Sequence, residues 1–145
     1  MIPKRIILHH SLTKDSQTVS WGAIRKYHME VMGWKEIGYH FGSEIVGDHY
    51  EILVGRMMNE VGAHCEGQNK DTLSICFVGN FDLDEVPPEQ WNQGIKLVAS
   101  LCTIFKISPS MIYGHHEFNP NKTCPGLKFP VHGFIQQVAE RIGSQ

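Results

Sequence analysis

Three residues whose side chains favour a divalent metal lie in two separate parts of the sequence. His115 and Cys124 lie nine positions apart within the segment 114–126, and His9 follows a short apolar run, 5–8, near the N-terminus. Imidazole nitrogen and thiolate sulfur are ligands that zinc prefers, and three protein ligands leave one position of a tetrahedral ion free for water. If the fold brings these residues together, the sequence predicts a catalytic zinc site.

Zinc in such a site makes hydroxide available at neutral pH, because it lowers the pKa of bound water from about 15.7 toward about 7. Hydroxide attacks a carbonyl carbon, and the resulting oxyanion needs a positive charge or a hydrogen-bond donor. Lys122, two residues before Cys124, could supply the charge, and the phenol of Tyr39 could orient the water or the oxyanion. The pattern predicts hydrolysis at a carbonyl group.

Each of these residues also has an ordinary explanation. The chain has nine histidines, and a single histidine is more often a surface or satisfied core residue than a ligand. A buried, inert thiol explains Cys124 alone as well as a metal ligand does. The interposed Lys122 and the Pro-Gly pair after Cys124 favour the metal site. His10, His64 and His116 stay open between supporting the site, facing the substrate and being solvated, and we favour solvation for His116.

The composition limits the class of protein. With 145 residues, 41% hydrophobic and 19% charged, the chain suits one globular domain. A net charge of −2 offers no broad positive field, so nucleic-acid binding is not expected. We find no membrane span of roughly 20 apolar residues and no signal-peptide core. We therefore expect a monomer that is cytoplasmic at synthesis, without a membrane or nucleic-acid partner.

The four cysteines show no CxxC spacing, so free thiols are expected rather than disulfides. Cys76 and Cys102 fall on apolar patterns and are predicted to be core residues. Cys65 lies in a Gly-rich loop, where it could be exposed, and we assign it no role.

The hydrophobic patterns predict an α/β fold: a single domain with a central mixed β-sheet flanked by about three helices. Strands are expected at 5–8, 37–46, 50–54, 73–78 and 111–113, helices at 21–32, 87–105 and 131–142, and loops beside the site at 11–19 and 55–71. Ser20 is the expected N-cap of the first helix, with Gly33 just past its end. The hairpin turn is placed at Gly47-Asp48 or Asp48-His49, and His49 in place of a glycine suggests a different or strained turn.

These segments resemble the zinc-dependent N-acetylmuramoyl-L-alanine amidases, the amidase type 2 family of phage endolysins and peptidoglycan recognition proteins. The resemblance covers residues 6–11 (the first zinc strand), 37–41 (the catalytic tyrosine), 62–64 with Asn69 and 73–81 (the substrate loop and next strand), and 114–115 with 122–126 (the remaining ligands). Four segments in the same order make the resemblance specific.

The resemblance implies a Zn²⁺ cofactor and a role for each candidate residue. The implied ligands are His9, His115 and Cys124, the implied catalytic pair is Tyr39 and Lys122, and the residues implied to face the substrate are His64 and Asn69. The implied substrate is peptidoglycan, cut between the lactyl group of N-acetylmuramic acid and L-alanine, with residues 1–145 as the catalytic domain. A phage lysis enzyme without a signal peptide would need a separate membrane-permeabilising, holin-type partner to reach the wall.

Two alternatives follow from the same resemblance. Cytosolic amidases that recycle muropeptides typically have an aspartate at the third ligand position and a glutamate where Tyr39 stands. Non-catalytic peptidoglycan-binding modules of the family lack the cysteine ligand. Cys124 and Tyr39 together favour an active enzyme of the endolysin and recognition-protein branch.

Overall fold

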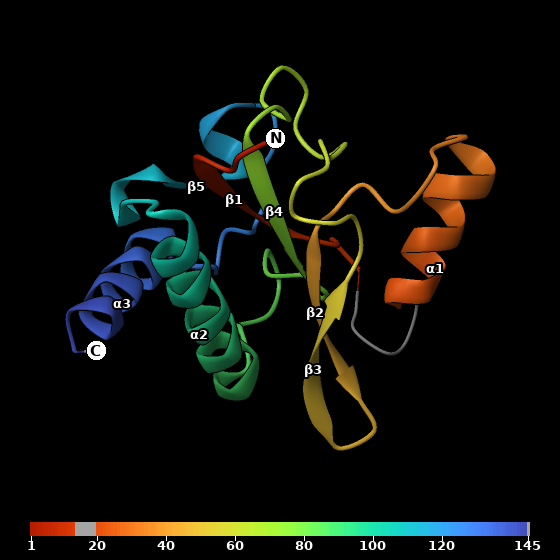
Figure 1. Cartoon of the computed structure of the whole chain (residues 1–145). Coiled ribbons are helices and arrows are strands. Elements are labelled where there is room, and N and C mark those ends of the chain that lie inside the picture. Colours follow the sequence, from red (N-terminus) through yellow and green to blue (C-terminus); the bar gives the residue numbers. More distant parts are fainter. Residues whose placement is uncertain (14–19, 145) are drawn as a thin grey trace.

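A computed structural model describes residues 1–13 and 20–144 of the chain. One sheet contains five strands: β1 (Arg5–His10), β2 (Phe41–Val46), β3 (His49–Val54), β4 (Thr72–Phe77) and β5 (Ile112–Gly114). The helices are α1 (Trp21–Lys26), the π-helical turn η1 (Tyr27–Val31), α2 (Pro88–Phe105), the 3₁₀ turns η2 (Pro109–Met111) and η3 (His115–Glu117), and α3 (Val131–Gly143). The mixed sheet and three α-helices confirm the predicted α/β class (Figure 1).

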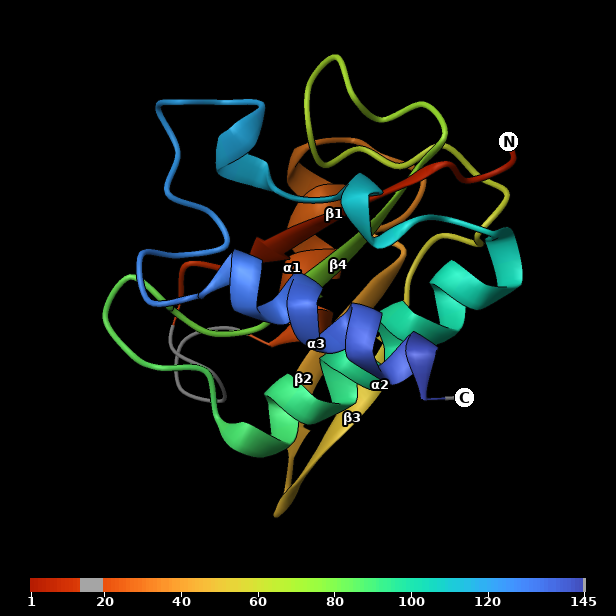
Figure 2. The same ribbon diagram turned by 90° about the vertical axis from the view of Figure 1, so that its left-hand side faces the viewer.

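The strand order is β3-β2-β4-β1-β5, and only the hairpin pair β2–β3 is antiparallel. β4 is the central strand, and all six of its residues are buried, as its nearly continuous apolar sequence predicts. The helices α2 and α3 pack together over one face of the sheet, whereas α1 lies on the opposite face (Figures 1 and 2). The sheet is therefore covered on both sides.

Alternation along β1 points successive side chains to opposite faces of the sheet, and each face carries an apolar cluster. Ile6 and Leu8 pack in the larger cluster, with α2 and α3. On the opposite face, Trp21 of α1 forms a smaller cluster with Ile37 and Cys76. Because His9 pairs in register with Cys76 of β4, it points to the α1 face, away from the main core.

Most element boundaries differ from the predictions by one or two residues, and three differences change the local structure. The expected helix 21–32 starts under its Ser20 cap but changes to a π-helical turn after Lys26. The expected strand 37–46 begins only at Phe41. The backbone carbonyls of 38–40 accept hydrogen bonds from the loop 55–63, and the His40 N–H donates to Ser74 of β4. Met111 belongs to η2, so the last strand starts one residue later.

The hairpin turn is not strained at His49. Val46 pairs with His49, which leaves Gly47 and Asp48 as the two turn residues. Gly47 takes the positive φ of 67°, as a turn with glycine at its first central position requires. His49 pairs as a regular strand residue, so the expected strain is absent there.

The cysteine predictions are confirmed for the two expected core residues, and the exposure considered for Cys65 is not found. Cys76 and Cys102 are buried, but Cys65 is also buried, with 4% of its surface exposed. The amide oxygen of Asn69 accepts the backbone N–H of Cys65, which folds the loop back on itself. The loop predicted at 11–19 falls largely outside the described residues.

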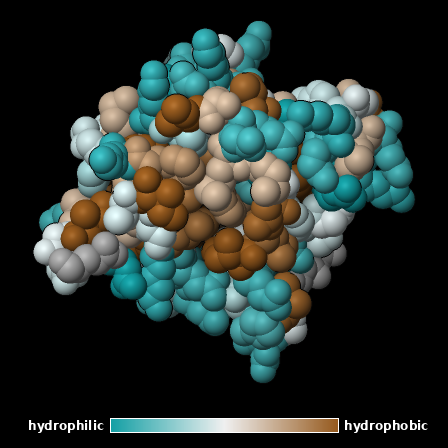
Figure 3. Space-filling model, in the orientation of Figure 1, coloured by the Kyte–Doolittle hydropathy of each residue, from teal (hydrophilic) through white to brown (hydrophobic). Residues whose placement is uncertain are grey.

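On the face shown in Figure 3, apolar residues gather near the centre and hydrophilic residues surround them. Among the described residues, no helix combines the length and apolar character needed to cross a membrane.

Candidate active site

The register of two parallel strands brings the first two candidate ligands together. Leu8 of β1 pairs with Gly114 of β5, so the next residues, His9 and His115, emerge side by side at the carboxyl ends of the strands. Their ring centroids lie 4.6 Å apart. His9 is 1% exposed and is held by the sheet itself, whereas His115 opens the 3₁₀ turn η3.

The loop after η3 returns Cys124 to the same place. Its sulfur lies 3.7 Å from Nδ1 of His9 and accepts a hydrogen bond from the backbone N–H of His10 at 3.3 Å. The backbone N–H of His116 donates to the carbonyl of Cys124 at 2.8 Å, which closes the loop. One ligand atom each from His9, His115 and Cys124 lies within 4.8 Å of the other two.

This donor set fits zinc. Typical Zn–N and Zn–S bonds at a tetrahedral angle separate the two ligand atoms by about 3.6 Å, close to the spacing between His9 and Cys124. Burial lowers the pKa of His9 well below its usual value and also lowers that of His115, so both imidazoles are neutral and able to bind a metal. Burial raises the pKa of the Cys124 thiol to about 12, a shift that a bound cation would reverse.

Tyr39 lies over the ligand cluster, with its ring centroid 5.2 Å from that of His9. The residue lies just before β2, and its backbone position is fixed because its carbonyl accepts a hydrogen bond from the Arg56 N–H at 3.0 Å. The neighbouring Gly38 has no room for a side chain, because a Cβ would lie 2.0 Å from the carbonyl oxygen of Ala63. Burial, with the nearby thiols, raises the pKa of Tyr39 well above its usual value, so its hydroxyl is a hydrogen-bond donor at neutral pH.

Lys122 contributes positive charge to the same cavity. Its side chain is exposed. At His115 its charge adds to burial in lowering the pKa, and at Cys124 it offsets part of the rise in pKa that burial causes. The cavity has a volume of about 250 Å³. Its lining residues are His9, His10, Ser11, Leu12, Tyr39, His64, His115, Lys122, Thr123 and Cys124.

The two residues expected to face the substrate occupy different positions. His64 lines the cavity, and its Nδ1 lies 3.0 Å from Nε2 of His9. Asn69 is not among the described residues that line the cavity. Its amide oxygen instead accepts the backbone N–H groups of His64 and Cys65, each at 2.9 Å, and so shapes the loop. A substrate contact by either residue stays a prediction.

One residue that shapes the site has no signal in the sequence pattern. Asp82 accepts hydrogen bonds from the Thr123 hydroxyl and the Leu127 backbone N–H, both at 2.9 Å. These bonds fix both ends of the turn that carries Cys124. Because Thr123 and Asp82 are 41 positions apart, only the folded chain reveals the contact.

The family assignment rests on the sequence as well as on this geometry. Residues 1–127 match the family model described as N-acetylmuramoyl-L-alanine amidase. The chain belongs to this amidase family. It is therefore a hydrolase of peptidoglycan, and the resemblance noted in the sequence is confirmed.

Relatives of this amidase include phage and animal proteins. It is 34% identical to the endolysin of Escherichia phage T7 over 128 residues, covering 84% of this chain and 80% of the relative. It is 29% identical to peptidoglycan-recognition protein SC1a of Drosophila melanogaster over 126 residues, covering 83% of this chain and 66% of that protein. The structure of the amidase LysC from Clostridium intestinale superposes with a TM-score of 0.83 at 29% identity, covering 96% of this chain and 87% of LysC.

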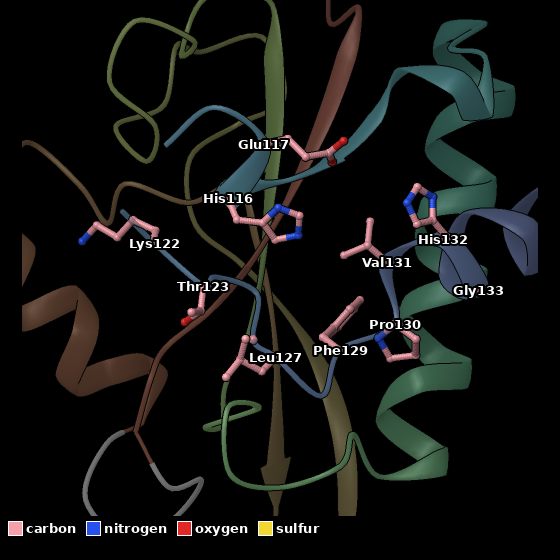
Figure 4. A pocket seen from close by; sticks show the side chains of 11 residues that line it. His116, Glu117, Lys122, Thr123, Leu127, Phe129, Pro130, Val131, His132 and Gly133 are labelled. Carbon is pink, nitrogen blue, oxygen red and sulfur yellow. The ribbon is translucent and has the colours of Figure 1, made fainter. Parts of the chain in front are cut away.

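A second cleft of the amidase lies beside the ligand cavity and shares Lys122 and Thr123 with it. Its volume is about 490 Å³, and in Figure 4 the rings of His116 and His132 stand on either side of Val131. The Lys122 amine points away from the other lining residues of this cleft (Figure 4). His116, expected to be solvated, is half-buried here.

Proposed function

We propose that this amidase is a zinc enzyme of the endolysin type, cutting the amide between the lactyl group of N-acetylmuramic acid and L-alanine. His9, His115 and Cys124 are the proposed ligands, and residues 1–145 the proposed catalytic domain. The observation that carries the proposal is the approach of three soft donor atoms within 4.8 Å on the wall of one cavity. The endolysins among the relatives support the cell wall as the place of action.

When bound, zinc would polarise the carbonyl and supply a nucleophilic water at neutral pH. Around it, the Lys122 ammonium provides positive charge for the oxyanion, and the Tyr39 hydroxyl donates a hydrogen bond to the water or the oxyanion. The pKa of Tyr39 lies well above neutral, so the phenol keeps its proton for this role. The backbone N–H of His10 holds the Cys124 sulfur in place.

The enzyme proposal is favoured over a non-catalytic binding module because Tyr39, Lys122 and the three donor residues all border one cavity. A muropeptide-recycling amidase is less compatible with a thiol donor at position 124. The monomeric state, the cytoplasmic site of synthesis and the holin-type partner stay predictions from the sequence.

The test is an incubation of purified peptidoglycan with the zinc-loaded protein, followed by labelling of new amino termini. We expect new N-terminal alanine without new reducing sugar ends, loss of this product after chelation, and recovery with added zinc. Protein that pellets with the wall but exposes no new termini at any zinc concentration would instead identify a binding module. Activity that persists after complete removal of metal would contradict the zinc assignment.

A further inference from the structure

The two ring nitrogens of His9 face different partners. Nδ1 lies 3.7 Å from the sulfur of Cys124, inside the proposed zinc ligand set. Nε2 lies 3.0 Å from Nδ1 of His64, on the opposite side of the ring. A nitrogen that binds a metal has no proton, so Nε2 of His9 must carry the proton and donate it to His64.

We infer that His64 is a positioning residue for the zinc ligand His9, an inference that rests on the proposed zinc site. By accepting the Nε2 proton, Nδ1 of His64 fixes the tautomer of His9 that presents Nδ1 to the metal. The same bond fixes the rotation of the His9 ring. Residues that bond in this way to a metal-binding histidine typically contribute about 10- to 100-fold to metal affinity.

The surroundings of His64 hold its ring in the required place. Its backbone N–H donates a hydrogen bond to the side-chain oxygen of Asn69 at 2.9 Å, which sets the position of the loop. On one side the ring meets His40 edge to face, at a centroid distance of 6.1 Å. His40 is itself fixed by a 2.7 Å hydrogen bond between its Nε2 and the carbonyl of Glu60.

A glycine permits this arrangement. A Cβ on Gly62 would lie 2.8 Å from the His64 ring and 2.9 Å from the His40 ring, so a larger residue would displace one of them. The segment Gly62-Ala63-His64 therefore places the Nδ1 acceptor of His64 beside Nε2 of His9. Asn69 takes part indirectly, through the loop backbone.

A positioning role and a substrate contact predict different measurements. If His64 orients His9, its loss weakens zinc binding whether or not substrate is present. If His64 only contacts substrate, its loss raises KM and leaves zinc affinity unchanged.

The experiment measures zinc affinity by competition with a chromophoric chelator in the wild-type protein and two variants. His64→Ala removes the acceptor, and we expect zinc affinity to fall about 10- to 100-fold. His64→Asn places an amide oxygen near the position of Nδ1 and should recover most of the loss. His49→Ala, on the exposed hairpin, is the matched control and should bind zinc like the wild type.

A second readout needs no variant. In ¹⁵N-edited NMR of the zinc-loaded wild type, His9 should be the Nε2–H tautomer, with that proton protected from exchange by the bond to His64. An Nδ1-protonated His9, or unchanged zinc affinity in His64→Ala, would overturn the inference. A wild-type protein that binds no zinc would instead refute the proposed function, and the inference with it.

Discussion

The Nδ1 atom of His9 lies 3.7 Å from the sulfur of Cys124, although the two residues are 115 positions apart in the chain. A sheet strand holds the first and a hydrogen-bonded loop holds the second, so their spacing is set by the fold before any ligand binds. Removing either donor should therefore affect metal binding more than folding.

The sulfur donor is tested by Cys124→Ser. We expect loss of bound zinc and of amidase turnover, because a hydroxyl is a much poorer zinc ligand than a thiolate. Metal content and release of N-terminal alanine are the measurements. Cys102→Ala, which removes a buried thiol from the other side of the molecule, is the control and should retain both. Full activity of Cys124→Ser without zinc would contradict the ligand assignment.

The role of the phenol is tested by Tyr39→Phe. The variant should keep its zinc but lose about 100-fold or more in kcat, the scale of a lost hydrogen bond to a developing oxyanion. The aromatic ring stays, so packing against His9 should be preserved. Wild-type turnover in this variant would remove Tyr39 from the chemistry.

Lys122→Met should lower kcat by a similar factor of about 100, because it removes the positive charge that we propose stabilises the oxyanion. The same charge lowers the pKa of His115, so its loss should raise that pKa in the metal-free protein. NMR titration of His115 reports the second effect independently of activity. An unchanged pKa of His115 in this variant would show that the Lys122 charge does not act on His115.

Zinc affinity should rise with pH. The pKa of Cys124 is about 12, so the metal-free thiol is protonated near neutral pH, whereas His9 and His115 are already neutral. Binding therefore releases one proton, and affinity should increase about tenfold per pH unit between about pH 7 and 8. Calorimetry in buffers of different ionisation enthalpy measures the proton count. Affinity independent of pH would contradict this account.

The metal-free protein should lose stability as the pH falls below about 6.5. Burial lowers the pKa of six histidines, namely His9, His10, His28, His40, His64 and His115. These groups bind protons below about pH 6.5 when unfolded but resist protonation when folded, so the unfolded state takes up more protons. The exposed His49, whose pKa is raised by Asp48 and Glu51, acts in the opposite direction.

Thermal unfolding of chelated protein at pH 8 and pH 5.5 measures this dependence, with a lower Tm expected at pH 5.5. A Tm that stays constant or rises on acidification would show that the buried histidines are accessible to protons in the folded state.

The sequence by itself determined the fold class and the family. The nearly unbroken apolar run at 73–78 predicted a buried strand, and the hydrophobic pattern of 87–105 predicted the helix α2. The types of His9, His115 and Cys124 indicated zinc chemistry before any geometry was known, because imidazole and thiolate are chemically selective donors. These are local properties, and local sequence encodes them.

Only the tertiary structure decided how the site is supported. The contacts of His64 with His9 and of Asp82 with Thr123 join residues 55 and 41 positions apart, which strand register and loop path bring together. Asn69 shapes its own loop through local bonds to His64 and Cys65. The burial of Cys65 also depends on the fold, since a Gly-rich loop is exposed or enclosed according to what it folds against. Hydrogen bonds across long sequence separations leave no periodic pattern, so they become visible only when the sheet has aligned β1, β4 and β5.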